Sequence, residues 1–350
     1  MRLSRRSLMI KGAAATAGFA ATQVFQPRPA RAQTGEVNLY SSRHYNTDDE
    51  LYETFTDLTG IRVNLLEGKA DELLARIENE GANGPADVFM TVDAGMLWRA
   101  DQAGVFAPVS STTLTNNIPE NLRHPEGKWF GFSKRARVIM YNKATVDPTE
   151  LSTYEDLADS RWRGRILIRS SGNIYNQSLV ASLIESNGLE DTEAWAEAFV
   201  SNFARPPEGN DRAQIEAAAA GLGDIAIANT YYLPRYLEDD DPAKQAIFEK
   251  IGVFFPNQTG RGTHVNVSGA GVVASAPHPE AAQQFLEYLS GTEAQGFFAK
   301  GNNEYPVVED AELAPVVAGF GSFKDDSVNV SAYGENQAAA IQLMDRVGWL

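Results

Sequence analysis

The chain contains no cysteine and only four histidines among its 350 residues. Without thiols it can form no disulfide bond, no thiolate zinc site and no iron–sulfur cluster, and nothing suggests a soft metal. The histidines also lack the grouping of two His and one carboxylate that non-haem iron oxygenases use. These absences argue against a redox enzyme.

Two common motifs of enzymes are missing as well. The glycine-rich stretch Gly260-Arg261-Gly262-Thr263 lacks the Lys-Ser/Thr ending of a phosphate-binding loop. No nucleophile elbow occurs anywhere in the chain. We therefore expect a protein without catalytic activity.

Basic residues are scarce after the first 32 positions. Residues 1–32 contain six basic residues and no acidic one, so the rest of the chain has a net charge of −22, against −16 for the whole. A body that acidic should not bind nucleic acid, because counterion release needs a basic surface. The charge is typical of a protein that works in a cation-rich space.

The first 32 residues have the form of an export signal. Arg5-Arg6 precedes an apolar run from Met9 to Ala21, and Ala30-Arg31-Ala32 is a small-residue cleavage site. The run is shorter than a good membrane span, which needs roughly 20 apolar residues. We predict a twin-arginine signal peptide over residues 1–32, cleaved after Ala32, which sends the protein to the periplasm through the twin-arginine export machinery. The alternative is a basic amphipathic helix on a cytoplasmic protein.

Strand-like and helix-like segments alternate along the rest of the chain. Thr47 with Glu50 predicts a capping box at the start of one helix, and Gly60 predicts its end. Such alternation indicates an α/β fold with mostly parallel sheets flanked by helices. The predicted strands cover residues 37–40, 61–66, 86–92 and 165–168, and the predicted helices cover residues 47–59, 70–80, 95–102, 177–186, 193–203 and 212–220.

Two long β-rich stretches, Trp129–Tyr141 and Val253–Val273, flank a central α/β block. They predict a two-strand hinge between two lobes. Lobe one would comprise residues 33–133 plus 265–304, and lobe two residues 134–264 plus 305–350, with a C-terminal helix near residues 335–347 packed on lobe two. Ligands of such proteins bind in the crevice at the carboxyl ends of strands.

Tyrosines follow several of the strand-like runs. Tyr231 and Tyr232 come directly after an apolar run, His44 and Tyr45 follow another, and Tyr175 lies in a polar turn. Phenol oxygens and an imidazole are ligands that a hard trivalent cation prefers. A bound cation displaces the phenol protons, although phenols are neutral at pH 7. We therefore interpret these five residues as ligands of ferric iron.

Four phenolates and Fe³⁺ leave one negative charge. Arg235, one turn beyond the tyrosine pair, is the first candidate to offset that charge, and Arg43 is a weaker one. An isolated tyrosine is more often a packing residue than a ligand. Adjacent Tyr231 and Tyr232 cannot share one helix face, however, so packing explains only one of them.

Several short motifs resemble those of the ferric-ion-binding proteins of bacterial iron ABC importers, with the closest likeness to the cyanobacterial-type branch. The resemblance covers nearly the whole chain after residue 32. The motifs are Ser41-Ser42-Arg43-His44-Tyr45, Glu67-Gly68-Lys69, Pro85-Ala86-Asp87-Val88, Arg169-Ser170-Ser171, Tyr175-Asn176-Gln177-Ser178, Gly209-Asn210-Asp211, Asn229-Thr230-Tyr231-Tyr232 and Gly260-Arg261-Gly262-Thr263-His264.

This resemblance implies a two-lobe class II periplasmic binding protein that closes over Fe³⁺ and delivers it, as a monomer, to an inner-membrane ABC permease. It implies the ligands His44, Tyr45, Tyr175, Tyr231 and Tyr232. One departure is Val92, at a position where many relatives outside this branch have a ligand Glu. Those relatives also bind an anion near the Ser-rich turn, where this chain has Tyr175, so the resemblance does not establish a required anion.

A receptor for a polyamine or another small organic ion on the same fold is the alternative. Polyamine sites need acidic residues and aromatic boxes, and the tyrosines alone do not exclude one. The colour of the loaded protein distinguishes the two, because phenolate-bound ferric iron absorbs visible light and an organic ion does not.

Overall fold

The computed structural model describes residues 35–43, 45, 47–308 and 310–350. The predicted signal peptide and His44 lie outside these residues. The strands are β1 Gly35–Ser41, β2 Ile61–Glu67, β3 Val88–Thr91, β4 Phe130–Asn142, β5 Ile166–Leu167, β6 Ile225–Asn229, β7 Ile251–Phe254, β8 Val265–Val272 and β9 Tyr305–Pro306.

Helices surround these strands. They are α1 Asp48–Thr59, α2 Ala70–Glu80, α3 Ala94–Gln102, α4 Thr112–Asn117, α5 Ile174–Asn187, α6 Leu189–Val200, α7 Asp211–Ala219, α8 Pro234–Leu237, α9 Pro242–Lys250, α10 Pro279–Leu289, α11 Thr292–Asn302, α12 Pro315–Ala318, α13 Ser331–Glu335 and α14 Gln337–Arg346. The described chain also has short 3₁₀ turns, of which Thr230–Tyr232 is important for the site.

The strands hydrogen-bond in the order β2-β1-β3-β8-β4-β6-β5, and β7 and β9 also pair with β4. The first half of β4 pairs with β8, and its second half pairs with β6 and β7. We call the β2-β1-β3-β8 side lobe one and the β6-β5-β7 side lobe two. The predicted parallel pairing is found for β1 with β2 and β3 and for β5 with β6. The sheet is mixed rather than mostly parallel, because the long strands β4 and β8 pair antiparallel to their neighbours.

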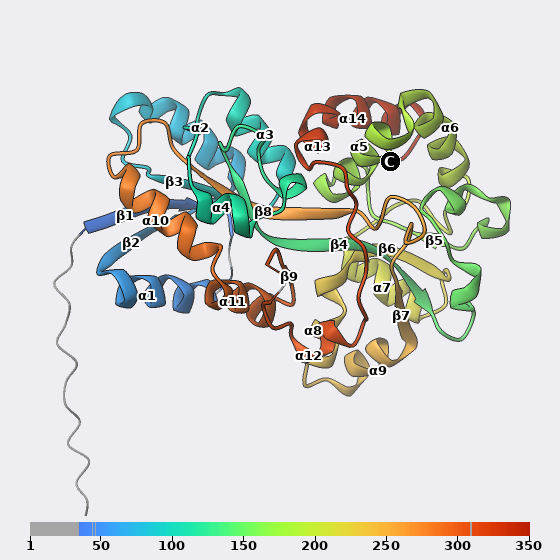
Figure 1. Cartoon of the computed structure of the whole chain (residues 1–350). Helices are drawn as coiled ribbons and strands as arrows, with labels where there is room; N and C mark the ends of the chain where they lie inside the picture. The colour runs from blue at the N-terminus through green and yellow to red at the C-terminus, as the bar shows by residue number, and fades with distance from the viewer. Residues whose placement is uncertain (1–34, 44, 46, 309) are drawn as a thin grey trace, which may run out of the picture. The chain divides into compact units, whose positions relative to one another are not determined.

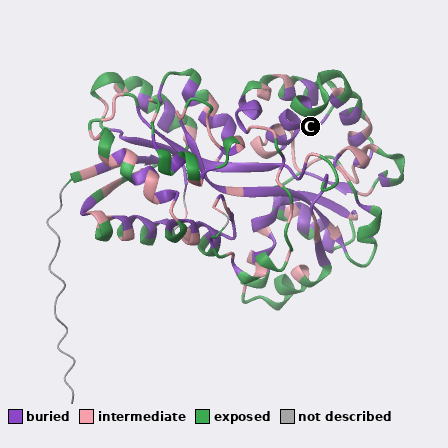
Figure 2. Cartoon of the chain, viewed as in Figure 1, coloured by how far each residue is buried: buried purple, intermediate pink, exposed green. Residues whose placement is uncertain are grey.

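Two buried strands connect the lobes. Figure 1 shows β4 and β8 running side by side between the two groups of helices, and Figure 2 shows them buried along most of their length. A side chain at Gly269 would place its Cβ 2.6 Å from the carbonyl oxygen of Phe130, so only glycine permits this close approach. The predicted two-strand hinge corresponds to this pair of strands.

The second predicted β-rich stretch is not continuous. β7 ends at Phe254 and β8 begins at Val265, with a turn between them in which Asn257 has a φ of 61°. Pro256, Gly260 and Gly262 interrupt the strand pattern there, since proline donates no hydrogen bond and glycine favours turns.

The predicted end of the first helix is confirmed, and its predicted cap is wrong. Gly60 ends α1 with a left-handed φ of 79°, a conformation that favours glycine. Thr47 has helical backbone angles and makes no side-chain capping bond. Its hydroxyl hydrogen-bonds the side chain of Asn302 on α11 instead, so a tertiary contact replaces the local one.

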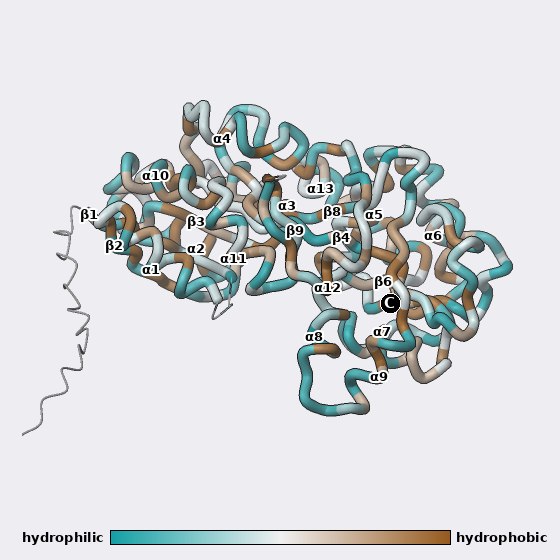
Figure 3. Tube along the Cα trace, turned by 60° about the horizontal axis from the view of Figure 1, so that its bottom comes forward, coloured by the Kyte–Doolittle hydropathy of each residue, from teal (hydrophilic) through white to brown (hydrophobic). Residues whose placement is uncertain are grey.

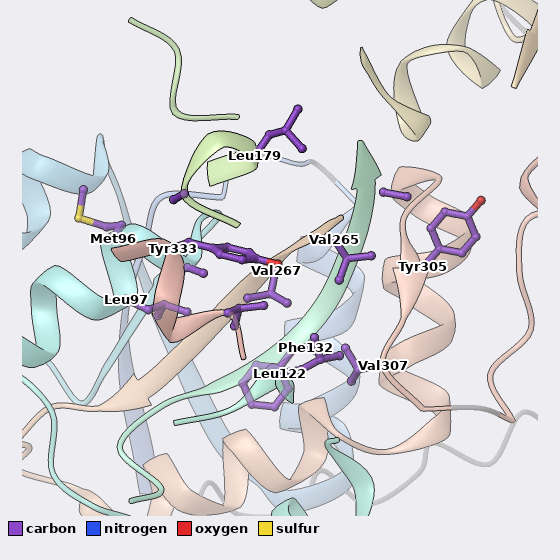
Figure 4. Packing of buried hydrophobic residues seen from close by; sticks show 14 of the residues in the cluster. Met96, Leu97, Leu122, Phe132, Leu179, Val265, Val267, Tyr305, Val307 and Tyr333 are labelled. Atoms are coloured by element: carbon purple, nitrogen blue, oxygen red, sulfur yellow. The ribbon is translucent and has the colours of Figure 1, made fainter. Parts of the chain in front are cut away.

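The C-terminal segment contacts both lobes. α14 packs on α5, whereas α13 packs on α5 and also on α3 of lobe one. Figure 4 shows Tyr333 of α13 beside Met96 and Leu97 of α3 and Val267 of β8, with Leu179 of α5 nearby. The chain between α8 and α9 is mostly hydrophilic (Figure 3), and no residue of α9 is buried. No helix in the described part of the chain is long and apolar enough to cross a membrane.

Candidate metal centre

A tight turn after β6 brings the adjacent tyrosines together. Thr230–Tyr232 forms one 3₁₀ turn, and the ring centres of Tyr231 and Tyr232 lie 4.3 Å apart. Tyr231 is buried and Tyr232 is half-buried. Because the turn is neither a strand nor a full helix, the two side chains can lie side by side.

Tyr175 joins this pair from another element. It lies in the first turn of α5, where the Asn173 side chain caps the helix by accepting a hydrogen bond of 3.0 Å from the Tyr175 backbone N–H. The hydroxyl of Tyr231 donates to the hydroxyl of Tyr175 across 3.3 Å. Three of the predicted ligands therefore lie together in lobe two.

Tyr45 approaches the same group from lobe one. Burial raises the pKa of Tyr45 to about 12, the Glu304 carboxylate adds to this rise, and the nearby Tyr175 phenol contributes as well. Burial, followed by the Tyr175 and Tyr232 phenols, raises the pKa of Tyr231 well above its usual value, and burial and Tyr175 also raise that of Tyr232. These three phenols are therefore neutral at pH 7 in the absence of a cation.

A buried group of charged side chains lies beside Tyr45. The Arg43 guanidinium lies 4.8 Å from the centre of the Tyr45 ring and forms ion pairs with Asp48 at 2.8 Å and Glu304 at 3.2 Å. Arg135 of β4 forms a second ion pair with Glu304 at 3.2 Å. Burial alone would raise the pKa of Glu304, but Arg43 and Arg135 lower it below its usual value, so this carboxylate is charged.

Arginines also lie against the phenols of lobe two. Arg137 and Arg169 lie 6.0 and 5.7 Å from the Tyr175 ring centre. Both pair with the buried carboxylate of Asp211, at 3.1 and 3.4 Å.

Two further arginines lie against the adjacent tyrosines. Arg235 lies 5.2 Å from the Tyr231 ring centre, and Arg212 lies 5.9 Å from that of Tyr232. With respect to residues that the structure describes, neither guanidinium forms a hydrogen bond or an ion pair. A cavity of about 180 Å³ adjoins Tyr232 and both of these arginines.

The charges around the four phenols therefore do not balance. Six guanidiniums lie near three buried carboxylates, those of Asp48, Asp211 and Glu304. The cavity beside Tyr232 adds Glu216, Asp239 and Lys244, so cations outnumber carboxylates by two among these groups. Within the described residues no group of three or more His, Asp or Glu is placed to hold a metal. A metal at this site would depend on the phenols, and the positive surroundings favour phenols that have lost their protons.

The family of the chain follows from a comparison with known proteins. A model of the bacterial extracellular solute-binding protein family matches residues 83–319. The chain belongs to this family.

The relatives of this solute-binding protein include iron proteins. Iron uptake protein A1 of Synechocystis is 61% identical over 314 residues, which cover 90% of this chain and 87% of that protein. Iron uptake protein A2 of the same organism is 55% identical over 351 residues, 99% of each chain. A Trichodesmium protein solved in complex with iron and citrate ligands is 65% identical, with a TM-score of 0.88, and the match covers 90% of this chain and 100% of that one. The resemblance to ferric-iron-binding proteins is confirmed.

The structure brings four of the five predicted ligands of this solute-binding protein together, and the fifth, His44, lies outside the described residues. Arg43 and Arg235, both predicted to offset charge, lie against Tyr45 and Tyr231. At Val92 the backbone carbonyl accepts a hydrogen bond from Arg135, and the side chain supplies no oxygen.

The sequence patterns did not assign four arginines near the phenols to the site: Arg135, Arg137, Arg169 and Arg212. The sequence does contain a pattern that indicates a role for Arg135 and Arg137. They alternate on β4 on either side of Ala136, and two charges with a period of two point to the same face of a buried strand. Such a pair predicts buried carboxylate partners.

Proposed function

We propose that this protein binds one ferric ion between its lobes and delivers it to an inner-membrane ABC permease. The proposed ligands are the phenolates of Tyr45, Tyr175, Tyr231 and Tyr232, with the imidazole of His44 as the fifth. The relatives named as iron uptake proteins and the neighbour with bound iron support the choice of metal.

The observation that carries this proposal is the convergence of four phenols within a net positive shell of arginines. Fe³⁺ binds anionic oxygen strongly, and a bound cation lowers the pKa of its ligands. The four phenolates exceed the charge of the metal by one. The surplus guanidiniums stabilise that negative charge, and among the described residues Arg235 and Arg212 have no carboxylate that pairs with them.

Closure of the lobes would complete the site. Tyr45 belongs to lobe one, and Tyr175, Tyr231 and Tyr232 belong to lobe two. We assign residues 33–133 plus 265–304 to lobe one and residues 134–264 plus 305–350 to lobe two. A metal that bonds to both lobes favours the closed state by its higher affinity for that state. The permease would recognise the closed, monomeric protein.

Export precedes this role in our proposal. Residues 1–32 would direct the protein through the twin-arginine machinery and be removed after Ala32, so that the mature protein acts in the periplasm. We expect mass spectrometry of the exported protein to find Gln33 as the mature N-terminus, and a protein that retains residues 1–32 would contradict this assignment.

The charge of the site disfavours a polyamine as ligand. An organic cation needs free carboxylates, and the three buried carboxylates near the phenols are already held by arginine: Asp48 by Arg43, Glu304 by Arg43 and Arg135, and Asp211 by Arg137 and Arg169. An amine would therefore enter surroundings of its own sign.

Metal content and colour test the proposed function. We expect the wild type, after loading with ferric nitrilotriacetate, to hold one iron per chain and to absorb visible light through phenolate-to-iron charge transfer. The double variant Tyr231→Phe/Tyr232→Phe removes two oxygens and keeps both rings, so it should fold normally and lose the coloured iron.

Tyr236→Phe is the matched control for this experiment. Tyr236 lies nearby on α8, is equally buried, and uses its hydroxyl to bond Glu216 and the carbonyl of Arg212 rather than the other phenols. This variant should bind iron as the wild type does. Stoichiometric coloured iron in the double variant would overturn the assignment of the ligands, and a colourless wild type would overturn the metal.

A further inference from the structure

A buried polar cluster connects the two lobes close to the phenols. The Asp93 carboxylate, which caps α3 in lobe one, accepts hydrogen bonds from Asn266 at 2.6 Å and from the Ser178 hydroxyl at 3.1 Å. Asn266 lies on β8, and Ser178 lies on α5 in lobe two. All three side chains are at most 5% exposed.

Both ends of this contact adjoin proposed parts of the metal centre. Ser178 follows Tyr175 by three residues, so it lies one turn further along the same face of α5. Asp93 follows Val92, whose carbonyl binds Arg135, and Arg135 pairs with Glu304 beneath Tyr45. The hydrogen bond between Ser178 and Asp93 thus fastens the helix of Tyr175 to the lobe of Tyr45.

The Ser178 oxygen accepts a hydrogen bond of 2.9 Å from the Asn266 side chain, and its single proton has two possible acceptors. Besides the Asp93 carboxylate, the carbonyl oxygen of Ile174, on its own helix, lies 2.9 Å away. The carboxylate is the stronger acceptor because it is charged. The Ile174 carbonyl stays within reach wherever α5 moves, since it belongs to the preceding turn.

Asp93 likewise keeps partners when Ser178 leaves. The side chain of Asn266 and the backbone N–H of Met96 still bond to it, and both come from lobe one or the strand that joins the lobes. Separation of the lobes therefore leaves the Asp93 carboxylate and the Ser178 hydroxyl with partners. The Asn266 amide loses its bond to Ser178 but keeps its bond to Asp93. The cost of leaving a buried polar group without any partner is thus avoided.

We propose that Ser178 and Asp93 are positioning residues, forming a reversible latch that holds Tyr175 against lobe one when the metal centre is assembled. The proposal rests on the ferric-binding function proposed above. The latch stabilises the closed, loaded state and contributes almost nothing to the open one, because in the open state the hydroxyl turns to Ile174. It therefore slows the release of iron.

Release kinetics test this latch. The protein is loaded with ferric nitrilotriacetate, mixed with an excess of EDTA, and followed by the loss of the charge-transfer band. Ser178→Ala should release iron roughly five- to tenfold faster than the wild type, the difference expected between a charge-assisted and a neutral hydrogen bond. The unfolding midpoint of its iron-free form should change little.

Ser182→Ala is the matched control. Ser182 lies one turn further along α5, is equally buried, and donates only to the carbonyl of Leu179 on its own helix. Its release rate should equal that of the wild type, and its iron-free form should unfold like that of Ser178→Ala. A mere loss of helix stability would affect both variants alike.

A second variant identifies the partner. Asp93→Asn should itself speed release. Adding Ser178→Ala to it should cause a smaller increase than in the wild type, because both changes act on the Ser178–Asp93 bond and only the bond from Asn266 to Ser178 is left to lose. Full additivity of the two changes would overturn the proposal, as would a Ser178→Ala release rate equal to that of the wild type. A wild type that never becomes coloured would overturn the ferric function and this proposal with it.

Discussion

Replacing Arg235 by glutamine should weaken iron binding at the candidate metal centre without changing the folding stability of the protein. The Arg235 guanidinium lies 5.2 Å from the centre of the Tyr231 ring and, toward the described residues, makes no hydrogen bond or ion pair. Its loss therefore leaves no buried carboxylate unpaired. We expect Arg235→Gln to fold and unfold like the wild type but to bind ferric iron more weakly.

The size of the effect follows from Coulomb's law. The guanidinium lies 5.2 Å from the Tyr231 ring centre. Two opposite charges about 5 Å apart attract by about 3 kcal/mol at an effective dielectric constant of about 20. Arg235 is only half-buried, so solvent reduces this to about 1–2 kcal/mol. The affinity for Fe³⁺ should fall roughly 5- to 30-fold.

Competition against nitrilotriacetate at fixed pH, followed by the charge-transfer band, measures this affinity. The difference between wild type and Arg235→Gln should shrink at high salt, because the side chain is partly exposed to screening. Arg163→Gln changes the net charge equally in an exposed turn before β5 and is the control. Equal losses in Arg235→Gln and Arg163→Gln, or no loss in either, would refute the local electrostatic role of Arg235.

Three further outcomes are expected. Solution scattering should show the wild type becoming more compact with ferric iron and Tyr45→Phe compacting less, because one bond from lobe one is lost; identical wild-type profiles with and without iron would contradict closure. The affinity for iron should fall steeply as the pH is lowered, since protons compete for the phenol oxygens, and a flat titration between neutral and mildly acidic pH would contradict phenolate ligands. The iron-free protein should lose stability as the pH rises from about 10, where phenols of the unfolded chain ionise, through the raised pKa of Tyr45 at about 12. Urea unfolding across that range measures this loss, which Tyr45→Phe should reduce.

Local patterns were enough to predict most of the secondary structure. Residues 70–80 form the predicted helix, and Gly60 ends α1 as expected, because periodicity and a left-handed glycine act within a few residues. The capping box at Thr47 failed because Asn302, far away in the sequence, offered its hydroxyl another partner. Local signals cannot include such competition.

In the candidate site, too, some features follow from the sequence and others only from the tertiary structure. The residue types at positions 45, 175, 231 and 232 pointed to a hard cation because phenol chemistry does not depend on the fold. Their convergence depends on the fold, since a 3₁₀ turn, the start of a helix and the segment after β1 supply them. The mixed sheet also lay beyond the sequence, because strand direction depends on long-range pairing.

The sequence by itself determined the chemistry available to this protein: no thiols, an acidic body, alternating β and α segments, and tyrosines placed after strands. Only the tertiary structure decided which charges surround those tyrosines. Glu304 lies between Arg43 and Arg135, which are 261 and 169 positions away in the sequence. A buried carboxylate is stable only where the fold brings it a cation, and no local pattern specifies which cation that is.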